Sequence, residues 1–381
     1  MGIIDINRAP DRLNVKISKA INSAELPGGR GILAYGDDND YPQLVENAVN
    51  SSVTGSSTAR ILSSAIMGEG FSNKRLNDVV IGRSVGGGEF KVHNLLSFAS
   101  KQVALFRGYY IHANRSATGM NTEIKPITFP KCRLSKPDDL GYSSKVIVSD
   151  EFNKRKIKNF TPYEIYQKNN DRFAESLIDI TKNKGQIYFK YFDDTYAYPL
   201  STFDSVLLDL LTENEVSNYR YNESANSFMP RNIVMVPEPE TDNEREEIKA
   251  KIEGMQGSGG DRTIVLTGDL DDDGKLNSKA AIHVAQIGAN IEDTLFESWE
   301  KIISNRIRKA AFALPEILIQ HDGSTLGTTS GEAIDKAVLF YNAVTRSIRE
   351  EFYSSIIPML KNFDNPILSN NEDWTINEMK L

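Results

Sequence analysis

The sequence predicts an α+β fold that is built partly from long helices. Apolar stripes of helical period dominate the last third of the chain, and short strand-like segments fill residues 108–152. Elements of the two types alternate without the βαβ rhythm of a parallel sheet. At 381 residues the chain has room for two or three domains, or for one elongated subunit of several parts. Its hydrophobic content of 40% and charged content of 25% are typical of an ordered chain.

Two short helices are predicted within residues 41–71, and a third covers Asn94 to Arg107. Pro42 suits the first turn of the first helix, and Gly68 stands where the second can end in a left-handed conformation. The third helix carries its apolar side chains on one face, and Gly108 is its expected stop. We therefore expect the N-terminal part to be mainly helical.

The middle of the chain changes to strand-like patterns. Runs of β-branched and aromatic residues, broken by Gly, Asn and Pro, occupy 109–114, 123–129 and 145–149. The pattern Thr161-x-x-Glu164, with Pro at the first helical position, is a capping box and predicts a further helix. Residues 185–201 are then expected to form a hairpin that turns at Asp193 and Asp194.

Helices and strands alternate again after residue 200. Residues 201–219 are expected to form a helix with an apolar stripe. Short strands are predicted at 232–236 and 263–268, and an exposed helix between them is opened by the capping box at 241–244.

Two long amphipathic helices close the chain. The stripe of the first comprises Ile291, Leu295, Trp299, Ile302, Ile303, Ile307 and Ala311. The stripe of the second comprises Ile334, Val338, Tyr341, Val344, Ile348, Phe352, Ile356 and Met359. Pro315 ends the first helix, and Thr329 with Glu332 forms a capping box for the second. Thirty residues would make the second a rod of roughly 45 Å.

The composition excludes several classes of protein. No apolar run approaches the ~20 residues that span a bilayer, and the first residues lack the apolar core of a signal peptide. The single Cys132 cannot form an internal disulfide, so a cytosolic folding environment is expected, and four scattered histidines leave no zinc site. The net charge of -8 argues against tight, static wrapping of nucleic acid. It does not argue against a protein that lets a polyanion slide past.

A run of Gly, Ser and Thr from Gly323 to Gly331 lies between the last two helices. A phosphate-binding P-loop needs two glycines five residues apart, then Lys and Ser or Thr, after a strand. Here Gly323 and Gly327 are too close, no Lys follows, and a helix precedes the run. The residues alone therefore favour a flexible connector over a nucleotide site.

A cluster of carboxylates follows the second predicted strand of the 232–268 region. Asp269, Asp271 and Asp273 with Gly274 match the first half of an EF-hand calcium loop, but the twelfth position is Ala280 instead of Glu. An acidic turn with solvated carboxylates is the favoured interpretation. Calcium binding is the alternative.

A basic cluster, comprising Lys154, Arg155, Lys156 and Lys158, stands out in an acidic chain. Such a cluster is either a solvated face or a surface that docks a partner or contacts DNA phosphates. No Ser/His/Asp or Cys/His arrangement can be assembled from the sequence. We therefore expect neither an enzyme nor a bound cofactor.

Five segments, taken in order, resemble the portal proteins of tailed double-stranded DNA bacteriophages, the head-to-tail connector family. The first carries a Tyr-Pro, a Ser-rich helix and Gly-x-Gly-Phe, and the fourth ends in Phe-x-x-Pro-x-x-Leu. The segments are 40–71, 105–127, 196–234, 291–319 and 330–360. The match in order and spacing covers roughly residues 40–360. The chain is short for a portal, so its crown would be small.

The resemblance implies an elongated portal-type subunit with a wing, a two-helix stem, a clip, a tunnel loop, and a long C-terminal helix leading to a short crown. The implied parts are an N-terminal wing part (1–93), a first stem helix (94–107), a clip (108–200), a second stem helix (201–220), a C-terminal wing part (221–322), a tunnel loop (323–331), and the long helix with the crown (332–381). The residues of the implied tunnel loop, which would face DNA, are Gly323, Ser324, Thr325, Leu326, Gly327, Thr328, Thr329 and Ser330.

The resemblance also implies a function. Portal subunits form a ring, usually a homododecamer, at one capsid vertex of the virion, and the ring is the channel for genome packaging and DNA ejection. The implied partners are the terminase, a head-completion adaptor, the major capsid protein or scaffold, and double-stranded DNA. The ring would assemble in the host cytoplasm, without a membrane. The basic cluster at 154–158 would lie on the clip.

An acidic channel would repel the phosphate backbone, so passing DNA would not be trapped.

Two alternative functions stay open. One is a metal-dependent enzyme that uses Asp269, Asp271 and Asp273. The other is a different ring-forming connector component of a virion.

Overall fold

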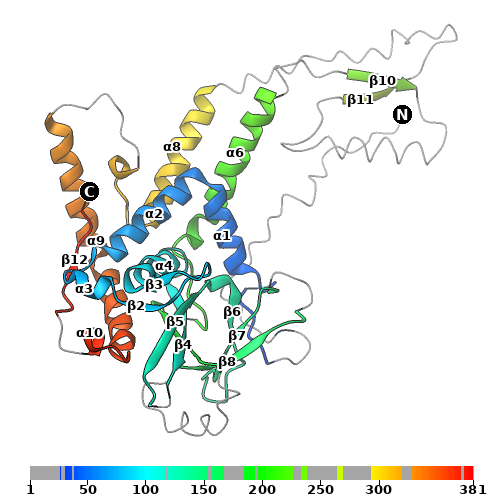
Figure 1. Ribbon diagram of the computed structural model, residues 1–381. Coiled ribbons are helices and arrows are strands. Elements are labelled where there is room, and N and C mark those ends of the chain that lie inside the picture. The colour runs from blue at the N-terminus through cyan, green and yellow to red at the C-terminus, as the bar shows by residue number, and fades with distance from the viewer. Residues whose placement is uncertain are drawn as a thin grey trace. The chain divides into compact units, whose positions relative to one another are not determined.

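The computed structural model describes residues 26, 31–36, 38–116, 118–152, 157–166, 184–193, 196–225, 233–237, 264–268, 293–319, 328–369 and 373–380. These residues belong to two compact units (Figure 1). Unit 1 comprises Met1–Leu207 and Ile307–Leu381, and unit 2 comprises Leu208–Arg306. The fold is mixed α and β, as the sequence predicts.

Unit 1 begins with helices. These early elements are α1 (Tyr41–Ser51), α2 (Val53–Met67), β1 (Gly70–Phe71), α3 (Lys74–Asn77), β2 (Val80–Arg83), β3 (Glu89–Lys91) and α4 (Val92–Phe106). Ser52 caps α2, because its hydroxyl accepts a hydrogen bond of 2.8 Å from the Gly55 N–H. The helices predicted at 41–71 and 94–107 are thus confirmed.

A six-stranded sheet forms the other layer of unit 1. Its strands are β4 (Gly108–Arg115), β5 (Asn121–Ile127), β6 (Cys132–Leu134), β7 (Lys145–Val148), β8 (Thr161–Ile165) and β9 (Gln186–Tyr191), in the spatial order β5-β4-β9-β8-β7-β6. Every neighbouring pair is antiparallel except β8 and β9. Helix α4 packs on β4 and β5, and α2 lies between α4 and α9 (Figure 1).

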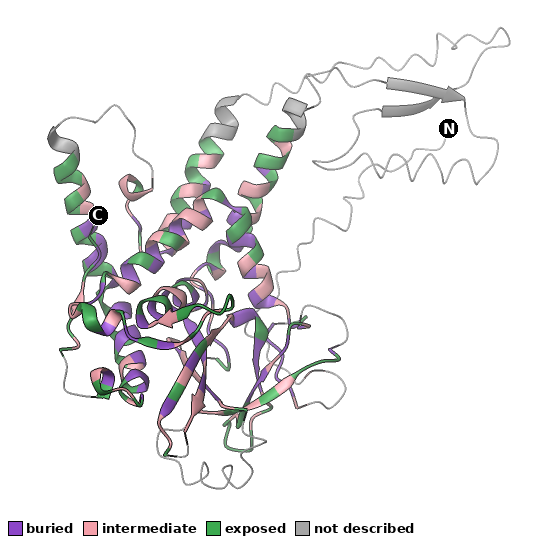
Figure 2. Cartoon of the chain, in the orientation of Figure 1, coloured by how far each residue is buried: buried purple, intermediate pink, exposed green. Residues whose placement is uncertain are grey.

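The core lies where α4 meets the sheet, and Figure 2 shows buried residues gathered there. The ring of Phe106 stacks on Phe129 with centroids 4.8 Å apart, and Tyr110 lies 5.0 Å from Phe129. Offset and edge contacts of this kind stabilise aromatic cores beyond simple burial.

Two glycines are required by close approaches of the backbone. Gly68 ends α2 at φ +61°, and a Cβ there would lie 2.1 Å from the carbonyl oxygen of Asn377. At Gly108 a Cβ would lie 2.9 Å from the carbonyl oxygen of Lys190. Gly108 was predicted to stop the third helix. In the structure Arg107 takes the left-handed position (φ 53°), and Gly108 opens β4 where that strand meets β9.

The rest of unit 1 follows residue 307. It comprises a 3-10 turn (Glu316–Leu318), α9 (Thr328–Lys361), α10 (Pro366–Ser369) and β12 (Ile376–Asn377). The 34 residues of α9 make a helix of about 51 Å. Strand β12 pairs antiparallel with β1, so the C-terminal segment lies beside the N-terminal helices (Figure 1).

Unit 2 contains two helices and a pair of strands. They are α6 (Leu207–Ala225) and α8 (Asp293–Ala310), each of which begins or ends just inside unit 1, with β10 (Ile233–Pro237) and β11 (Ile264–Gly268) between them in sequence. The strands pair in parallel. Both strands and both helices were predicted from the sequence. The helix predicted after 241 lies outside the described residues.

Two local predictions were wrong. The capping box at 161–164 predicted a helix, but these residues form β8, whose backbone pairs with β7 and β9. Pro162 fits there because it pairs with Ile147 of β7, while β9 joins only from Glu164 onward. The hairpin predicted at Asp193 does not form, because β4 and β8 already occupy both sides of β9.

Within the part of the chain that the structure describes, no helix combines the length and the apolar character needed to cross a bilayer.

Candidate functional site

Helices α6 and α8 of unit 2 are joined by two ion pairs. Near the start of α6, Asp209 lies 3.2 Å from Arg306 of α8, and farther along α6 Arg220 lies 2.5 Å from Glu300. Because the residue numbers rise on one helix as they fall on the other, the two helices are antiparallel. The Arg220 and Glu300 side chains are both nearly half exposed, so their pair contributes little stability. Asp209 is buried, so its ion pair with Arg306 contributes more to stability.

The residues of the apolar stripe predicted on α8 fall into two groups, one buried and one exposed. Ile303, Ile307 and Ala311 are buried, as predicted. Trp299 and Ile302 are instead 45% and 56% exposed. These two residues are three positions apart and therefore adjacent on the helix surface. We call Trp299 and Ile302 the α8 outer face.

The first half of α9 is apolar on both of its sides. Its inner side, with Val338, Tyr341 and Ile348, belongs to the core of unit 1. On its outer side Leu339 is 64% exposed and Phe340 51% exposed. Val344, which was predicted to belong to the same apolar stripe as Val338 and Tyr341, is also exposed. We call Leu339, Phe340 and Val344 the α9 outer face, and Figure 2 shows exposed residues along this part of the helix. Large apolar side chains that are exposed next to one another commonly mark an interaction site.

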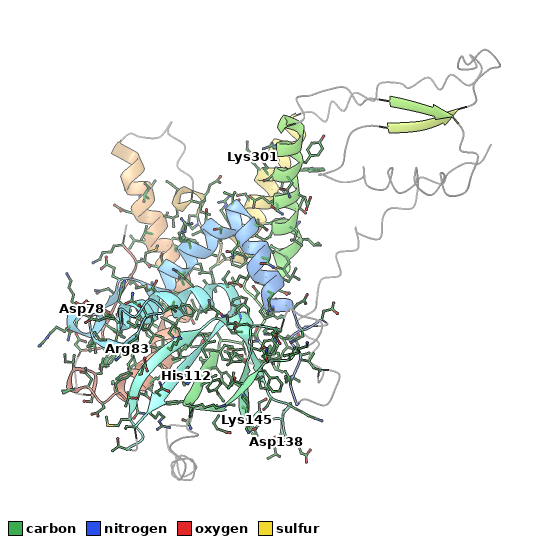
Figure 3. The ribbon with its side chains drawn as sticks, turned by 45° about the vertical axis from the view of Figure 1, so that its right-hand side comes forward. Asp78, Arg83, His112, Asp138, Lys145 and Lys301 are labelled. Atoms are coloured by element: carbon green, nitrogen blue, oxygen red, sulfur yellow. The ribbon has the colours of Figure 1, made fainter. Side chains whose placement is uncertain are left out.

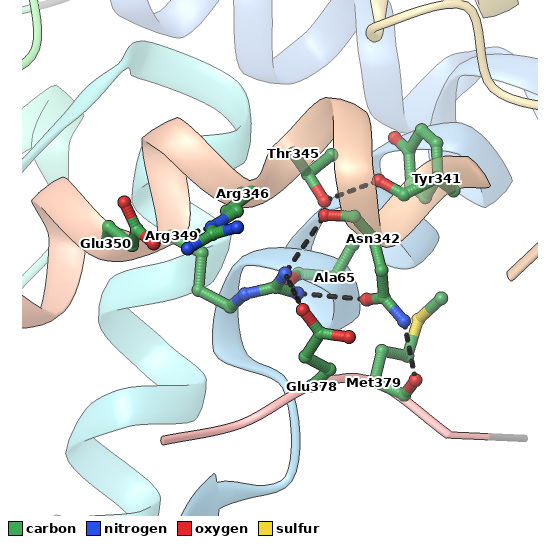
Figure 4. A network of polar contacts seen from close by, with 9 residues as sticks. All are labelled: Ala65, Tyr341, Asn342, Thr345, Arg346, Arg349, Glu350, Glu378 and Met379. Atoms are coloured by element: carbon green, nitrogen blue, oxygen red, sulfur yellow. Dashed lines mark hydrogen bonds and ion pairs between the residues drawn. The ribbon is translucent and has the colours of Figure 1, made fainter. Parts of the chain in front are cut away.

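A buried arginine holds α9 in place (Figure 4). The Arg349 guanidinium donates hydrogen bonds to the carbonyl oxygen of Ala65 in α2 at 3.0 Å and to Oδ1 of Asn342 at 2.9 Å. It also lies 3.3 Å from the Glu378 carboxylate near the C-terminus. Asn342 in turn donates to the carbonyl oxygen of Met379 at 2.9 Å. Burial lowers the pKa of Arg349, because desolvation disfavours its charged form. The hydrogen bonds and the ion pair offset this cost of burying the charge.

The second half of α9 is fixed to the sheet. The hydroxyls of Tyr109 in β4 and Ser355 in α9 are 2.7 Å apart. Tyr188 in β9 donates to the Ser355 carbonyl oxygen at 2.8 Å, and Lys190 pairs with Glu351 at 3.1 Å. The helix is therefore held by α2, by the C-terminal segment and by the sheet. Its outer face is presented on a rigid support.

A second buried network fixes the segment that leads into α6. The Tyr41 hydroxyl donates to Asp204 at 2.6 Å and accepts from the Ser201 N–H at 3.2 Å. The Ser201 hydroxyl donates to the carbonyl oxygen of Leu105 at 2.7 Å, at the end of α4. Burial, reinforced by Asp204, raises the pKa of Tyr41. The tyrosine therefore stays a neutral donor.

Beside this network lies Arg133, which is fully buried. It donates to the side chain and the carbonyl oxygen of Asn39, both at 2.6 Å. Its further acceptors are Oε1 of Gln43 and the carbonyl oxygens of Pro130 and Cys132. Burial lowers the pKa of Arg133, and a cradle of neutral acceptors holds the charge without a carboxylate. These contacts hold Asn39 and Gln43 against β6.

The sequence-predicted site residues fall mostly outside these networks. Gly323 to Gly327 lie outside the described residues, and Thr328, Thr329 and Ser330 form the first turn of α9 instead of a loop. Lys154, Arg155 and Lys156 also lie outside. Lys158 is exposed, and its backbone N–H donates to Glu151 at 2.7 Å.

The three aspartates at 269, 271 and 273 lie outside the described residues too. Elsewhere in the described chain, no group of three or more His, Cys, Asp or Glu side chains is placed to hold a metal ion. Cys132 is buried, and burial raises the pKa of its thiol, which makes it a poor nucleophile.

Sequence reasoning missed Leu339 and Phe340. The signal was present, because residues 337–341 read Ala-Val-Leu-Phe-Tyr, which is too apolar for a helix with one solvated side. It also missed Arg349, whose partners Ala65 and Glu378 are distant in the sequence.

Comparisons with known proteins find likeness in fold. A chain in the virion of the native gene transfer agent (GTA) particle has a TM-score of 0.50 and 12% identity, over 85% of this chain and 81% of that chain. A chain in the neck of the empty GTA particle, computed with C6 symmetry, has a TM-score of 0.48 and 12% identity over 85% and 82% of the two chains. A chain in the neck of the native particle, computed with C12 symmetry, has a TM-score of 0.47 and 13% identity over 92% and 86%. No family model and no curated protein matches the sequence.

Proposed function

We propose that this chain is the portal protein of a tailed-phage-like particle. It would form a ring at one capsid vertex, through which double-stranded DNA is packaged and later ejected. The observation that carries the proposal is the fold, which over 85% of the chain is similar to a chain of the GTA virion. The order of the five sequence segments supports it independently.

The antiparallel pair α6–α8 suggests a revised stem. The resemblance implied a stem at 94–107 and 201–220 with the clip at 108–200. Helix α4, which covers the first of these ranges, is buried against the sheet of unit 1. In our proposal the stem is α6 with α8, and the clip is the intervening segment that contains β10 and β11. The other domain boundaries stay predictions.

The surfaces of the chain suit assembly better than catalysis. The α8 and α9 outer faces expose large apolar side chains, which in proteins commonly mark interaction sites. The net charge of -8 suits a channel that repels DNA phosphates. We accordingly propose a structural ring of twelve copies without enzymatic activity. At the capsid vertex, the ring would bind first the terminase and then the head-completion adaptor.

The test is the assembly state of the purified chain. Mass photometry across a concentration series, with negative-stain imaging of the same samples, should show closed rings with a central hole wide enough for duplex DNA. A chain that stays monomeric at every concentration would overturn the proposal. So would metal-dependent turnover by a monomer. Open chains or filaments without closed rings would also contradict it, because a portal requires a closed channel.

A further inference from the structure

We propose that the turn between β6 and β7 of one copy inserts its apolar side chains into a pocket between β2 and β5 of a second copy of this chain. The inference rests on the proposed ring and names two surfaces that would join neighbouring subunits. The two surfaces lie at opposite edges of the six-stranded sheet of unit 1. A head-to-tail contact between unlike surfaces is the type that can close into a ring.

The turn between β6 and β7 carries two large side chains that lie mostly in water. Leu140 is 80% exposed and Tyr142 is 72% exposed. The two residues are two positions apart in the same turn, and we call them the β6–β7 tip. Large apolar side chains that are exposed together mark interaction sites. Tyrosine is also enriched among the residues that carry most of the binding energy of protein interfaces.

The β6–β7 tip is held in one conformation by the turn itself. The Asp138 carboxylate accepts hydrogen bonds from the Leu140 N–H at 3.0 Å and from the Tyr142 N–H at 2.8 Å. The Asp138 carbonyl oxygen accepts a further bond from the Gly141 N–H at 2.9 Å. Gly141 provides the positive φ of 87° in this turn. Because the turn is already ordered, binding of the tip costs little conformational entropy.

A pocket lies at the other edge of the sheet. It has a volume of about 550 Å³, which is large enough for an aromatic side chain. Its lining residues, which come from β2 and β5, are Val80, Ile81, Gly82, Arg83, Thr122 and Glu123. We call it the β2–β5 pocket. The two strands approach closely at Gly82, where a Cβ would lie 2.5 Å from the carbonyl oxygen of Ile124.

The lining of the β2–β5 pocket suits a tyrosine. Val80 and Ile81 provide apolar contact for a ring. The Arg83 guanidinium provides hydrogen-bond donors, and the Glu123 carboxylate provides an acceptor. A tyrosine that becomes buried needs both, because its ring is apolar and its hydroxyl needs a partner. In our proposal Tyr142 therefore enters the pocket of the neighbouring copy.

The tip cannot reach the pocket of its own chain. In the strand order β5-β4-β9-β8-β7-β6, at least four strand spacings separate the pocket on β5 from the tip beyond β7 and β6. At ~4.8 Å each, these make about 19 Å. Figure 3 shows Arg83, which lines the pocket, and Asp138, at the base of the tip, well apart on different sides of unit 1. Two matching sites at opposite edges of one sheet let each subunit bind a neighbour on either side, as a ring requires.

Cross-linking tests the contact between chains. Leu140→Cys is made in one preparation and Thr122→Cys in another that carries a size tag, and the two are mixed, assembled and treated with a short bis-maleimide. A cross-linked heterodimer is expected, and it can form only between different chains. The native Cys132 is buried and stays in place, with wild type as its control. Ser64→Cys, mixed with Leu140→Cys, is the matched control, because Ser64 is exposed on α2 outside the pocket lining.

Removal of the tip provides a second, independent test. Leu140→Ser combined with Tyr142→Ser should raise the concentration for half-assembly about tenfold or more. The far-UV spectrum and the urea midpoint of the unassembled chain should not change, because both side chains are already in water. Val53→Ser is the matched control and should assemble normally, since Val53 is a 75% exposed apolar residue of α2. Thr122→Trp, which fills the pocket from its rim, should weaken assembly as the tip variant does.

If wild type forms rings, normal assembly of the tip variant or the absence of a 140–122 cross-link would each overturn the inference and leave the proposed function standing. Wild type that never leaves the monomeric state would overturn both.

Discussion

Helix α4 and the first half of α9 have similar apolar character but different surroundings. In α4, Leu95, Leu96 and Val103 are fully buried, because the sheet lies on one side of the helix and α2 on another. In α9, the inner side is covered in the same way while Leu339 and Phe340 are left in solvent. Apolar periodicity thus predicts that a residue will be buried. It does not tell which chain will cover it.

The largest expected effect is on the free energy of unfolding, and it distinguishes α4 from the first half of α9. Leu95→Ala should lower the free energy of unfolding by about 2–5 kcal/mol, because it leaves a cavity in a fully packed core. Phe340→Ala should change it by less than about 0.5 kcal/mol in the unassembled chain, because its side chain is already half in water.

Urea denaturation below the assembly concentration measures both values. Leu96→Ala serves as a second core variant beside Leu95→Ala. A loss at Phe340 as large as that at Leu95 would show that α9 is covered within its own chain.

An intermediate effect is expected at the support of α9. Arg349→Met removes the donor that serves Ala65 and Asn342 and leaves buried acceptors unsatisfied, so it should cost about 2–4 kcal/mol. Glu378→Gln should cost less than about 1 kcal/mol, because the Glu378 side chain is 57% exposed and its charge is screened.

Both Arg349 and Glu378 variants can be compared by chemical denaturation and by the concentration for half-assembly. Arg349→Met should weaken assembly as well, since the α9 outer face would lose its rigid support. Equal costs at the two positions would mean that the ion pair, and not the backbone and amide contacts, holds the helix.

The contrast explains how far the sequence could predict the fold. Helices α1, α2, α4, α6, α8 and α9 were predictable because their amphipathic period is a local property of the chain. Strand β8 was not, since the capping box at Thr161 is equally local and two neighbouring strands override it. The hairpin at Asp193 failed for a related reason. Its partner position was taken by β4, whose residues lie about eighty positions earlier in the sequence.

The candidate site was predictable only in part. Trp299, Ile302 and Val344 were recognised as apolar positions of amphipathic helices, but an apolar stripe alone does not distinguish a core position from an exposed one. The network around Arg349 joins α2, α9 and the C-terminal segment, and no periodicity links residues that far apart. The position of Arg133 among neutral acceptors has no sequence signal either. The sequence around an arginine does not distinguish a buried side chain from a solvated one.

The smallest effect on stability and assembly is expected in the Gly, Ser and Thr run that precedes α9. Since Thr328 to Gly331 are helical, a deletion that tests the loop should remove Gly323 to Gly327 alone. Rings should form at the wild-type concentration, because the α9 outer face and the Arg349 contacts begin farther along the helix. DNA packaging or retention should nevertheless fall, if small hydroxyl residues and glycines present a weakly binding surface to DNA in the channel.

Packaged DNA protected from nuclease, measured in particles with equal portal content, checks the loop prediction. Leu326→Ser is the length-preserving control and should package normally. Loss of rings in the deletion would assign the run a structural role between unit 1 elements. Normal packaging would show that the loop does not act on DNA. It would not change the expected difference between the buried and exposed sides of α9.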